Sequence, residues 1–364
     1  MEHQHLGNYI RPVDVRNREL KVTNLLGVNL SKKFFPSIAN IIGTDLSKYK
    51  VIRKGQFGCK FMSVGRDGIL PISIMKEDEP AIISSAYYVF EVRDENVLLP
   101  DYLMMWLRRP EFDRQLAFYA GADVRGGVNY DDFCEMPIII PSIARQRAIV
   151  AEYETLSNRI RLNEQMIAKL EETAQALYRK MFVEGIDKEN LPEGWRRGKL
   201  GEVAVIKAGG DKPKEFSEEK TDTYNIPIYA NGIDNKGIFG YTTKPVVKKK
   251  SITISARGTI GYCFLRKQPY VPIVRLIVII PNNEAMTQYL YYHLDSSNIK
   301  GSGSVQSQLT VPDMEDLQIL IPSNHIMKEF HDKVEIIDKS IEFREQENEK
   351  LTELQSLLLA RMGR

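Results

Sequence analysis

Two stretches of this chain decide its fold: IIIPSIARQRAIVAEYETLSNRI, which runs from Ile138 to Ile160, and ILIPSNHIMKEFHDKVEIIDKSI, which runs from Ile319 to Ile341. Pro141 in the first stretch matches Pro322 in the second at an offset of 181 residues, and this offset holds without a gap for about forty residues. Because the offset is half the length of the 364-residue chain, the sequence contains a two-fold internal repeat.

Each copy of the repeat predicts a long helix. Ser142 and Ser323 follow the prolines as N-caps, and no Gly or Pro then interrupts the pattern before Gly185 and Gly363. Apolar residues recur in steps of four and three over about five heptads, which is typical of a coiled-coil seam. The residues predicted to form the helix pair and the subunit interface are Ile149, Tyr153, Leu156, Ile160, Ile167, Leu170, Val334, Ile337, Ile341, Leu351 and Leu358.

Polar residues interrupt both seams, namely Asn163 in the first helix and Arg344, Asn348 and Gln355 in the second. Such residues reduce stability but specify partner and register. We expect the two helices of one chain to pair antiparallel, each with a length of about 58 Å. The alternative is that each helix packs only on its own globular half.

The segments that precede the helices are also related, more loosely. Leu6-Gly7 matches Leu200-Gly201, and we align Lys54-Gly55-Gln56-Phe57-Gly58 with Arg257-Gly258-Thr259-Ile260-Gly261 at an offset of 203. The second segment predicts strands at 203–206, 226–229, 251–255 and 273–280 and a helix at 285–294, and the first a helix at 102–107. The fold class is therefore α+β, with two related α/β domains at 1–141 and 184–321, each followed by a long helix, at 142–183 and 322–364.

The charge balance is nearly neutral, with 50 Lys and Arg against 48 Asp and Glu. Together with 43% hydrophobic residues, it excludes a disordered chain and a polybasic tail. The charges are nevertheless unevenly placed. Six basic residues and no acid lie between Asp45 and Asp67, and nine basic residues and no acid lie between Asp234 and Glu284. Both windows contain one of the aligned glycine turns.

Positive surface of this kind suits phosphate contacts, and glycine lets backbone N–H groups approach a polyanion closely. The alternatives are a solvated basic face and tight hairpin turns that bind nothing. The candidate DNA-binding residues are Lys48, Lys50, Arg53, Lys54, Gln56, Ser63, Arg66, Arg125, Tyr229, Asn231, Lys248, Lys249, Lys250, Arg257, Thr259, Arg266, Gln306 and Gln308.

The sequence contains no credible catalytic or cofactor motif. The three cysteines form no CxxC pair, and there is neither a GxxxxGK[ST] loop nor an HExxH pattern. Asp211, Glu218 and Lys220 have the residue types of a metal-dependent nuclease but lie in a polar, proline-containing segment. No apolar run is long enough to span a membrane. We therefore expect no metal or cofactor in this chain, no membrane partner and a cytoplasmic location.

The chain resembles the specificity subunits of type I restriction–modification systems. The resemblance rests on the two proline-to-helix repeats and on LPEGWRRGKLGEVAVIKAGG from Leu191, IPIYANGID from Ile226 and SARGTIG from Ser255. It extends over nearly the whole chain. The first domain departs from it, because it has no tryptophan that matches Trp195 and its turn is KGQFG.

The resemblance implies a non-catalytic subunit whose two recognition domains each read half of a bipartite duplex DNA target. The antiparallel helices would set the gap between the half-sites and dock two methyltransferase subunits, through which restriction subunits join. S-adenosylmethionine would be held by the methyltransferase, and ATP and Mg would be used by the restriction subunit. Two other hypotheses remain open: a stand-alone metal-dependent nuclease, and a coiled-coil scaffold without DNA readout.

Overall fold

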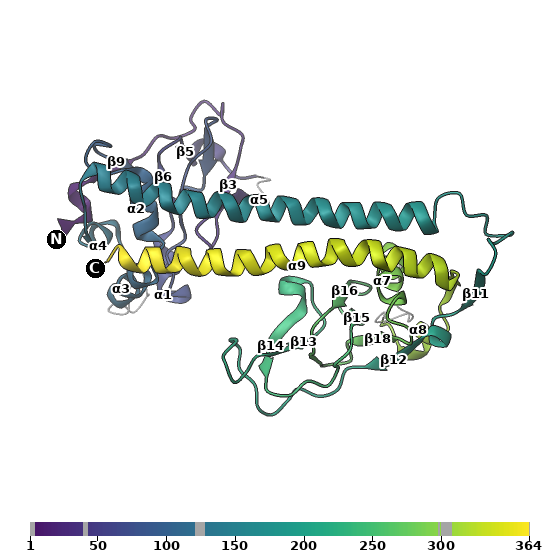
Figure 1. The fold of residues 1–364 in the computed structure, drawn as a ribbon. Coiled ribbons are helices and arrows are strands. Elements are labelled where there is room, and N and C mark those ends of the chain that lie inside the picture. The colour runs from purple at the N-terminus through teal and green to yellow at the C-terminus, as the bar shows by residue number, and fades with distance from the viewer. Residues whose placement is uncertain (1–3, 39–42, 121–127, 298, 300–307, 364) are drawn as a thin grey trace. The chain divides into compact units, whose positions relative to one another are not determined.

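Two long helices organise the chain in the computed structural model, which describes residues 4–38, 43–120, 128–297, 299 and 308–363. Helix α5 runs from Ile143 to Phe182 and helix α9 from Asn324 to Arg361 (Figure 1). The sequence predicts these helices at 142–183 and 322–364. The chain divides into two compact units, residues 1–163 with 346–364 and residues 164–345. Each unit therefore contains part of both helices.

The first unit is built on an antiparallel sheet with the strand order β2-β9-β6-β7. Two small pairs, β3-β4 and β5-β8, extend the strand region, and β1 pairs with β10. The elements are β1 Gln4–His5, β2 Ile10–Val13, β3 Leu26–Val28, β4 Phe34–Pro36, β5 Lys50–Ile52, β6 Phe57–Cys59, α1 Val64–Asp67, β7 Ile72–Ile74, β8 Ala81–Ile83, β9 Tyr88–Val92, α2 Pro100–Leu107, α3 Pro110–Ala120, α4 Tyr130–Cys134 and β10 Pro137–Ile138.

The second unit repeats this plan with an antiparallel sheet of order β12-β18-β15-β16. A smaller sheet of order β14-β13-β17 accompanies it, and β11 pairs with β19. The elements are β11 Arg196–Lys199, α6 Leu200–Val203, β12 Ala204–Ala208, β13 Ile226–Tyr229, β14 Ile238–Thr242, β15 Ser251–Ile254, β16 Cys263–Arg266, β17 Val271–Pro272, β18 Ile277–Pro281, α7 Met286–Ser296, α8 Val311–Glu315 and β19 Gln318–Ile321.

Two glycines confirm the repeat, Gly7 shortly before β2 and Gly201 shortly before β12. A Cβ on Gly7 would lie 2.7 Å from the Cβ of Cys134, and a Cβ on Gly201 would lie 3.2 Å from the carbonyl oxygen of Glu315. Cys134 and Glu315 are themselves related by the offset of 181. In both copies, two segments of the chain therefore approach so closely that a glycine is required at this point.

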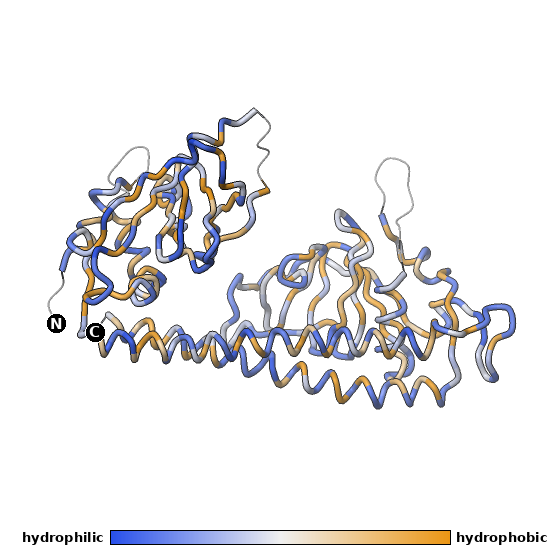
Figure 2. The backbone as a smooth tube through the Cα atoms, turned by 90° about the horizontal axis from the view of Figure 1, so that it is seen from above, coloured by the Kyte–Doolittle hydropathy of each residue, from blue (hydrophilic) through white to orange (hydrophobic). Residues whose placement is uncertain are grey.

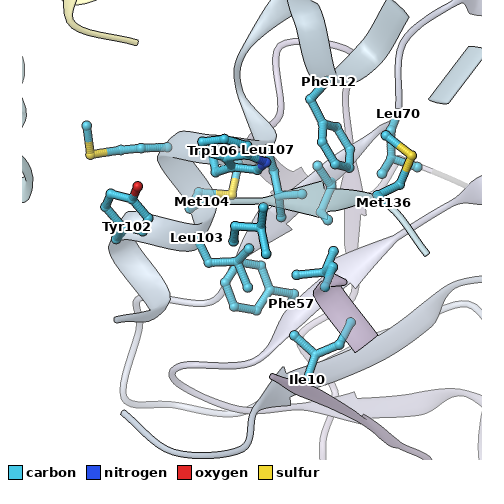
Figure 3. Close-up of a cluster of buried hydrophobic side chains, with 14 of the residues drawn as sticks. Ile10, Phe57, Leu70, Tyr102, Leu103, Met104, Trp106, Leu107, Phe112 and Met136 are labelled. Carbon is cyan, nitrogen blue, oxygen red and sulfur yellow. The ribbon is translucent and has the colours of Figure 1, made fainter. Parts of the chain in front are cut away.

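Each unit has its own hydrophobic core, and both long helices contribute to each core. In the first unit, Ile149 from α5 and Leu358 from α9 belong to one cluster with the sheet and α2, part of which is drawn in Figure 3. In the second unit, the rings of Phe182 from α5 and Phe330 from α9 meet edge to face at 5.0 Å. The alternative in which each helix packs only on its own half is therefore wrong.

Within the first unit, the helices run antiparallel and their polar seam residues pair with one another. Asn163 Nδ2 donates to Asn348 Oδ1 at 2.9 Å, and Gln355 Nε2 donates to Ser157 Oγ at 2.7 Å. Hydrophobic and hydrophilic segments alternate along both helices (Figure 2), as expected for helices that bury one face. The predicted fold class, two related α+β domains with paired antiparallel helices, is confirmed.

Candidate nucleic-acid interface

The two sheets place a pair of exposed basic residues at the same point. Arg53 and Lys54 precede β6, and Lys248 and Lys249 precede β15. Strands β6 and β15 hold equivalent places, because Phe57 pairs with the second strand of its sheet as Ile252 does in the other. The duplicated domain therefore presents two positive charges at the start of its third strand in both copies.

This arrangement corrects the alignment of the two glycine turns. The segment 54–58 leads into β6 and includes its first two residues, whereas the turn at 257–261 connects β15 to β16 and so follows the equivalent strand. The offset of 203 is therefore wrong for these segments, and the sheet registers relate Phe57 to Ile252 instead. A basic residue followed by two glycines is too short a signal to tell a turn that enters a strand from one that leaves it.

The turn after β15 is held open by an asparagine. Asn231 Oδ1 accepts from the backbone N–H of Ala256 at 2.7 Å, while Asn231 Nδ2 donates to the carbonyl of Val274 at 2.9 Å. Gly258 and Gly261 have φ values of +68° and +90°, which favour glycine. Both polar groups of Asn231 are thus used within the chain, so Asn231 shapes the turn.

A groove of about 340 Å³ lies beside this turn and is lined by Arg257, Arg275, Gln308 and Thr310. Arg257 Nη2 donates to Gln308 Oε1 at 3.2 Å, and both side chains are exposed. Val274 and Arg275 adopt φ values of +50° and +63°, which strain a β-branched residue in particular. The strained turn places an arginine in the groove, so the groove combines two guanidinium groups with a side-chain amide.

The predicted candidates did not include Arg275, although it lies in the second acid-free window. The sequence places it inside the apolar run 273–280, which predicts a single strand. The only sequence signal for its exposure is its charge within that run.

Three predicted contact residues are buried, which does not fit direct contact with DNA. Arg266 is 4% exposed, donates through Nε to Thr253 Oγ1 at 2.8 Å and stacks over the ring of Tyr229 at 3.5 Å. Lys50 is 9% exposed and lies over the Tyr88 ring, and burial lowers its pKa. Ser63 is also buried. The charge of a residue alone does not indicate which face of a strand its side chain occupies.

Three lysines of the second window form ion pairs with acidic residues of α9, and two of them, Lys250 and Lys267, are partly buried. Lys250 lies 3.3 Å from Glu284 and 3.4 Å from Glu335 on α9. Lys267 lies 3.2 Å from both Asp338 and Glu342, again on α9. Lys236 pairs with Glu345 in the same way, at 3.3 Å. The helix therefore neutralises part of the basic window, whereas Lys248 and Lys249 are adjacent, exposed and not paired with α9 in any of these contacts.

In the first unit, three of the exposed candidates pair with nearby carboxylates. Lys54 lies 2.6 Å from Asp78, Lys48 lies 3.4 Å from Asp45, and Arg66 lies 2.8 Å from Asp67. Pairs this exposed contribute little stability and can exchange for phosphate contacts. Gln56 differs, because Nε2 donates to Glu91 and Oε1 accepts from the backbone of Arg53.

The remaining candidates are less informative. Thr259 is exposed in the turn after β15. Arg125 and Gln306 lie outside the described residues. Asp211, Glu218 and Lys220 are all exposed in the segment between β12 and β13, and the residues that the structure describes contain no group of three His, Cys, Asp or Glu able to hold a metal ion.

Comparison with known proteins points to one family. The family model for the type I restriction modification DNA specificity domain matches residues 192–353. A curated type I specificity subunit of Mycoplasma pneumoniae is 39% identical over 142 residues, which cover 39% of this chain and 42% of that protein. The specificity subunit of the type I restriction enzyme HindI of Haemophilus influenzae is 22% identical across 98% of this chain and 97% of its own length.

A solved structure agrees in fold. The S subunit of a type I restriction–modification system from M. genitalium matches with a TM-score of 0.57 and 16% identity, covering 99% of this chain and 95% of the other.

The chain is similar to the specificity subunits of type I restriction–modification systems, and residues 192–353 match their DNA specificity domain.

The chain spans about two-fifths of the length of the two curated Mycoplasma pneumoniae relatives that it matches. Among the described residues, the structure has no helix with the length and apolarity needed to cross a membrane. The predicted helix-pair residues are distributed between buried and half-buried positions. Ile149, Val334, Ile341 and Leu358 are buried, and Tyr153, Leu156, Ile160, Ile167, Leu170, Ile337 and Leu351 are half-buried.

Proposed function

We propose that this chain is the specificity subunit of a type I restriction–modification system, that it reads a bipartite duplex DNA target with one half-site for each recognition domain, and that it docks two methyltransferase subunits along its paired helices. Restriction subunits join through those methyltransferases. The observation that carries the proposal is the duplicated architecture, in which matched domains present matched basic pairs, Arg53–Lys54 and Lys248–Lys249, at the same strand. A pseudo-symmetric reader of this kind suits a two-part target with two different halves.

The residues divide into two roles. Lys248 and Lys249 are exposed and do not line the groove, so in this proposal they contact phosphates. Arg257, Arg275 and Gln308 line one groove and offer the guanidinium and amide groups that read base edges. The first role sets affinity and its salt dependence, and the second sets sequence preference.

The chain itself has no catalytic part in this proposal. In this proposal, S-adenosylmethionine is held by the methyltransferase, and ATP and Mg are used by the restriction subunit. Purified specificity subunit alone should therefore neither methylate nor cleave DNA. Metal-dependent cleavage that is lost in Glu218→Ala would favour the nuclease hypothesis instead.

The test uses the specificity subunit assembled with its methyltransferase. Sequencing of methylated sites in DNA exposed to this complex identifies the target, and fluorescence anisotropy then compares target and scrambled duplexes. Target affinity should exceed scrambled affinity and fall steeply with salt. Equal affinity for both duplexes would overturn the proposal.

Variants separate the two roles. Replacing Lys248 and Lys249 together by Ala should weaken binding to every duplex and reduce the slope of log K against log salt by about two. Arg257→Ala or Arg275→Ala should cost about 1–3 kcal/mol on the target and relax preference at specific positions. Lys21→Ala, a change at an exposed lysine outside both acid-free windows and outside the paired helices, is the control and should alter neither quantity.

A further inference from the structure

A pocket of about 330 Å³ lies in the second unit where α5 ends, beside α7 and the strand β19. Its inner wall is aromatic, formed by Tyr178, Phe182 and Tyr289, which are buried. Lys188 and Arg197 lie at its rim and are exposed. None of the residues that line the pocket carries a carboxylate.

The repeat identifies the same place in the first unit. Tyr289 on α7 donates its hydroxyl to the carbonyl of Leu320, and Tyr102 on α2 donates to the carbonyl of Ile139. Leu320 and Ile139 are related by the offset of 181, so the two tyrosines are equivalent. One helical turn further along, His293 in the second unit therefore corresponds to a tryptophan in the first.

That tryptophan, Trp106, fills the corresponding space in the first unit. Trp106 is 3% exposed, and its Nε1 donates to the carbonyl of Pro137 at 3.2 Å. The guanidinium of Arg109 stacks over the indole at 4.2 Å. A Cβ on Gly363 would lie 1.9 Å from Arg109 Nη2, so the end of the described chain packs tightly there. Figure 3 shows Trp106 among the buried side chains of this core.

The second unit leaves the space open because histidine is smaller than tryptophan. His293 Nδ1 lies 3.1 Å from the hydroxyl of Tyr178, and its ring stacks on Tyr289 at 5.8 Å between centroids. Burial, with a smaller contribution from Lys188, lowers the pKa of His293. The imidazole is therefore neutral near pH 7, and the positive charge of the pocket is confined to its rim.

We propose that this pocket is a docking site for a segment of a partner protein in which an aromatic or aliphatic side chain stands beside a carboxylate. The apolar side chain enters the space that Trp106 occupies in the other copy. The carboxylate meets Lys188 and Arg197 at the rim. The aromatic wall favours an apolar side chain over a nucleic-acid phosphate, which would need positive charge at the base of the pocket as well.

The experiment measures fluorescence anisotropy of a fluorescein-labelled peptide, Asp-Phe-Leu-Asp-Phe-Glu, titrated with the full chain. A second peptide with lysine in place of each acid is the charge control. The acidic peptide should bind saturably, and the lysine peptide should bind at least about tenfold more weakly, a difference of about 1.4 kcal/mol. Absence of saturable binding of the acidic peptide below about 1 mM would overturn the proposal.

Three variants test the location. His293→Trp copies the first unit and should abolish binding by filling the pocket, while circular dichroism reports whether the chain still folds. Lys188→Glu changes an exposed rim residue, so it should fold normally and weaken binding about tenfold. Lys180→Glu makes the same charge change on α5 outside the pocket and should leave binding intact. Binding by His293→Trp and Lys188→Glu that equals binding by the wild type, or displacement of the peptide by duplex DNA, would refute the site.

Discussion

Asn163 should hold the helix pair in register, and the structure lets the effect of its removal be estimated. The side chain is 1% exposed, and Nδ2 donates to Asn348 Oδ1 at 2.9 Å and to Glu347 Oε2 at 2.8 Å. In Asn163→Ala, the Glu347 carboxylate keeps its bonds to Arg159 at 2.9 and 3.1 Å. The Asn348 amide loses this partner inside the seam.

A polar group left without its partner in a buried place costs about 1–3 kcal/mol. We therefore expect Asn163→Ala to lower the free energy of unfolding by about 1–3 kcal/mol. Replacing Asn163 and Asn348 together by Leu removes both partners and fills the seam, so it should restore stability or exceed that of the wild type while loosening the choice of register. Asn158→Ala, an exposed change on the same helix, should stay within about 0.5 kcal/mol.

Urea unfolding of the full chain, followed by circular dichroism of the helices, measures these differences from the midpoint at constant slope. Asn163→Ala and Asn158→Ala with equal midpoints would refute the reasoning. A double leucine variant that is less stable than Asn163→Ala would also refute it. In that case, removing both hydrogen-bonding partners would cost more than leaving one of them unpaired.

Three further outcomes follow from single sites. Burial lowers the pKa of His293, so the unfolded chain binds the extra proton below about 6.5; thermal unfolding midpoints should fall between about pH 7 and pH 5, and His293→Gln should reduce that fall. Asn231→Ala removes the acceptor of the Ala256 N–H, and in methylation assays of the assembled complex it should broaden sequence preference while leaving the salt slope unchanged. Gly209→Ala would place a Cβ 2.9 Å from backbone atoms and should destabilise by about 1–3 kcal/mol in urea unfolding, whereas Gly210→Ala meets nothing within 4 Å and should be neutral.

The long helices and the strand Ile226–Tyr229 could be predicted from the sequence because their signals are local and periodic. The predicted strand 273–280 failed in its first half. Val274 and Arg275 form a left-handed turn there, and β18 begins only at Ile277. The backbone of Gly209 reaches this turn, and an apolar run cannot show that a distant glycine approaches it.

The candidate interface was predictable in composition but not in geometry. The acid-free windows identify where basic residues concentrate, yet Arg266 stacks inside the domain and Lys250 pairs with a carboxylate on α9. Pairing between residues 85 positions apart has no signature in a single sequence. The register of the sheets was equally hidden, which is why the two glycine turns were aligned across opposite ends of the equivalent strands.

The two compact units differ in when the synthesis of their residues is complete. Residues 164–345 form one continuous segment, so the second unit has all its parts as soon as Glu345 has emerged. The first unit also needs residues 346–364, because Leu358, Leu359 and Met362 complete the core that begins at Leu6. During synthesis, the first domain to be translated is therefore the last to be finished. Until then it exposes the apolar surface that α9 will cover, and chaperones that recognise such surface have longest access to this half of the chain.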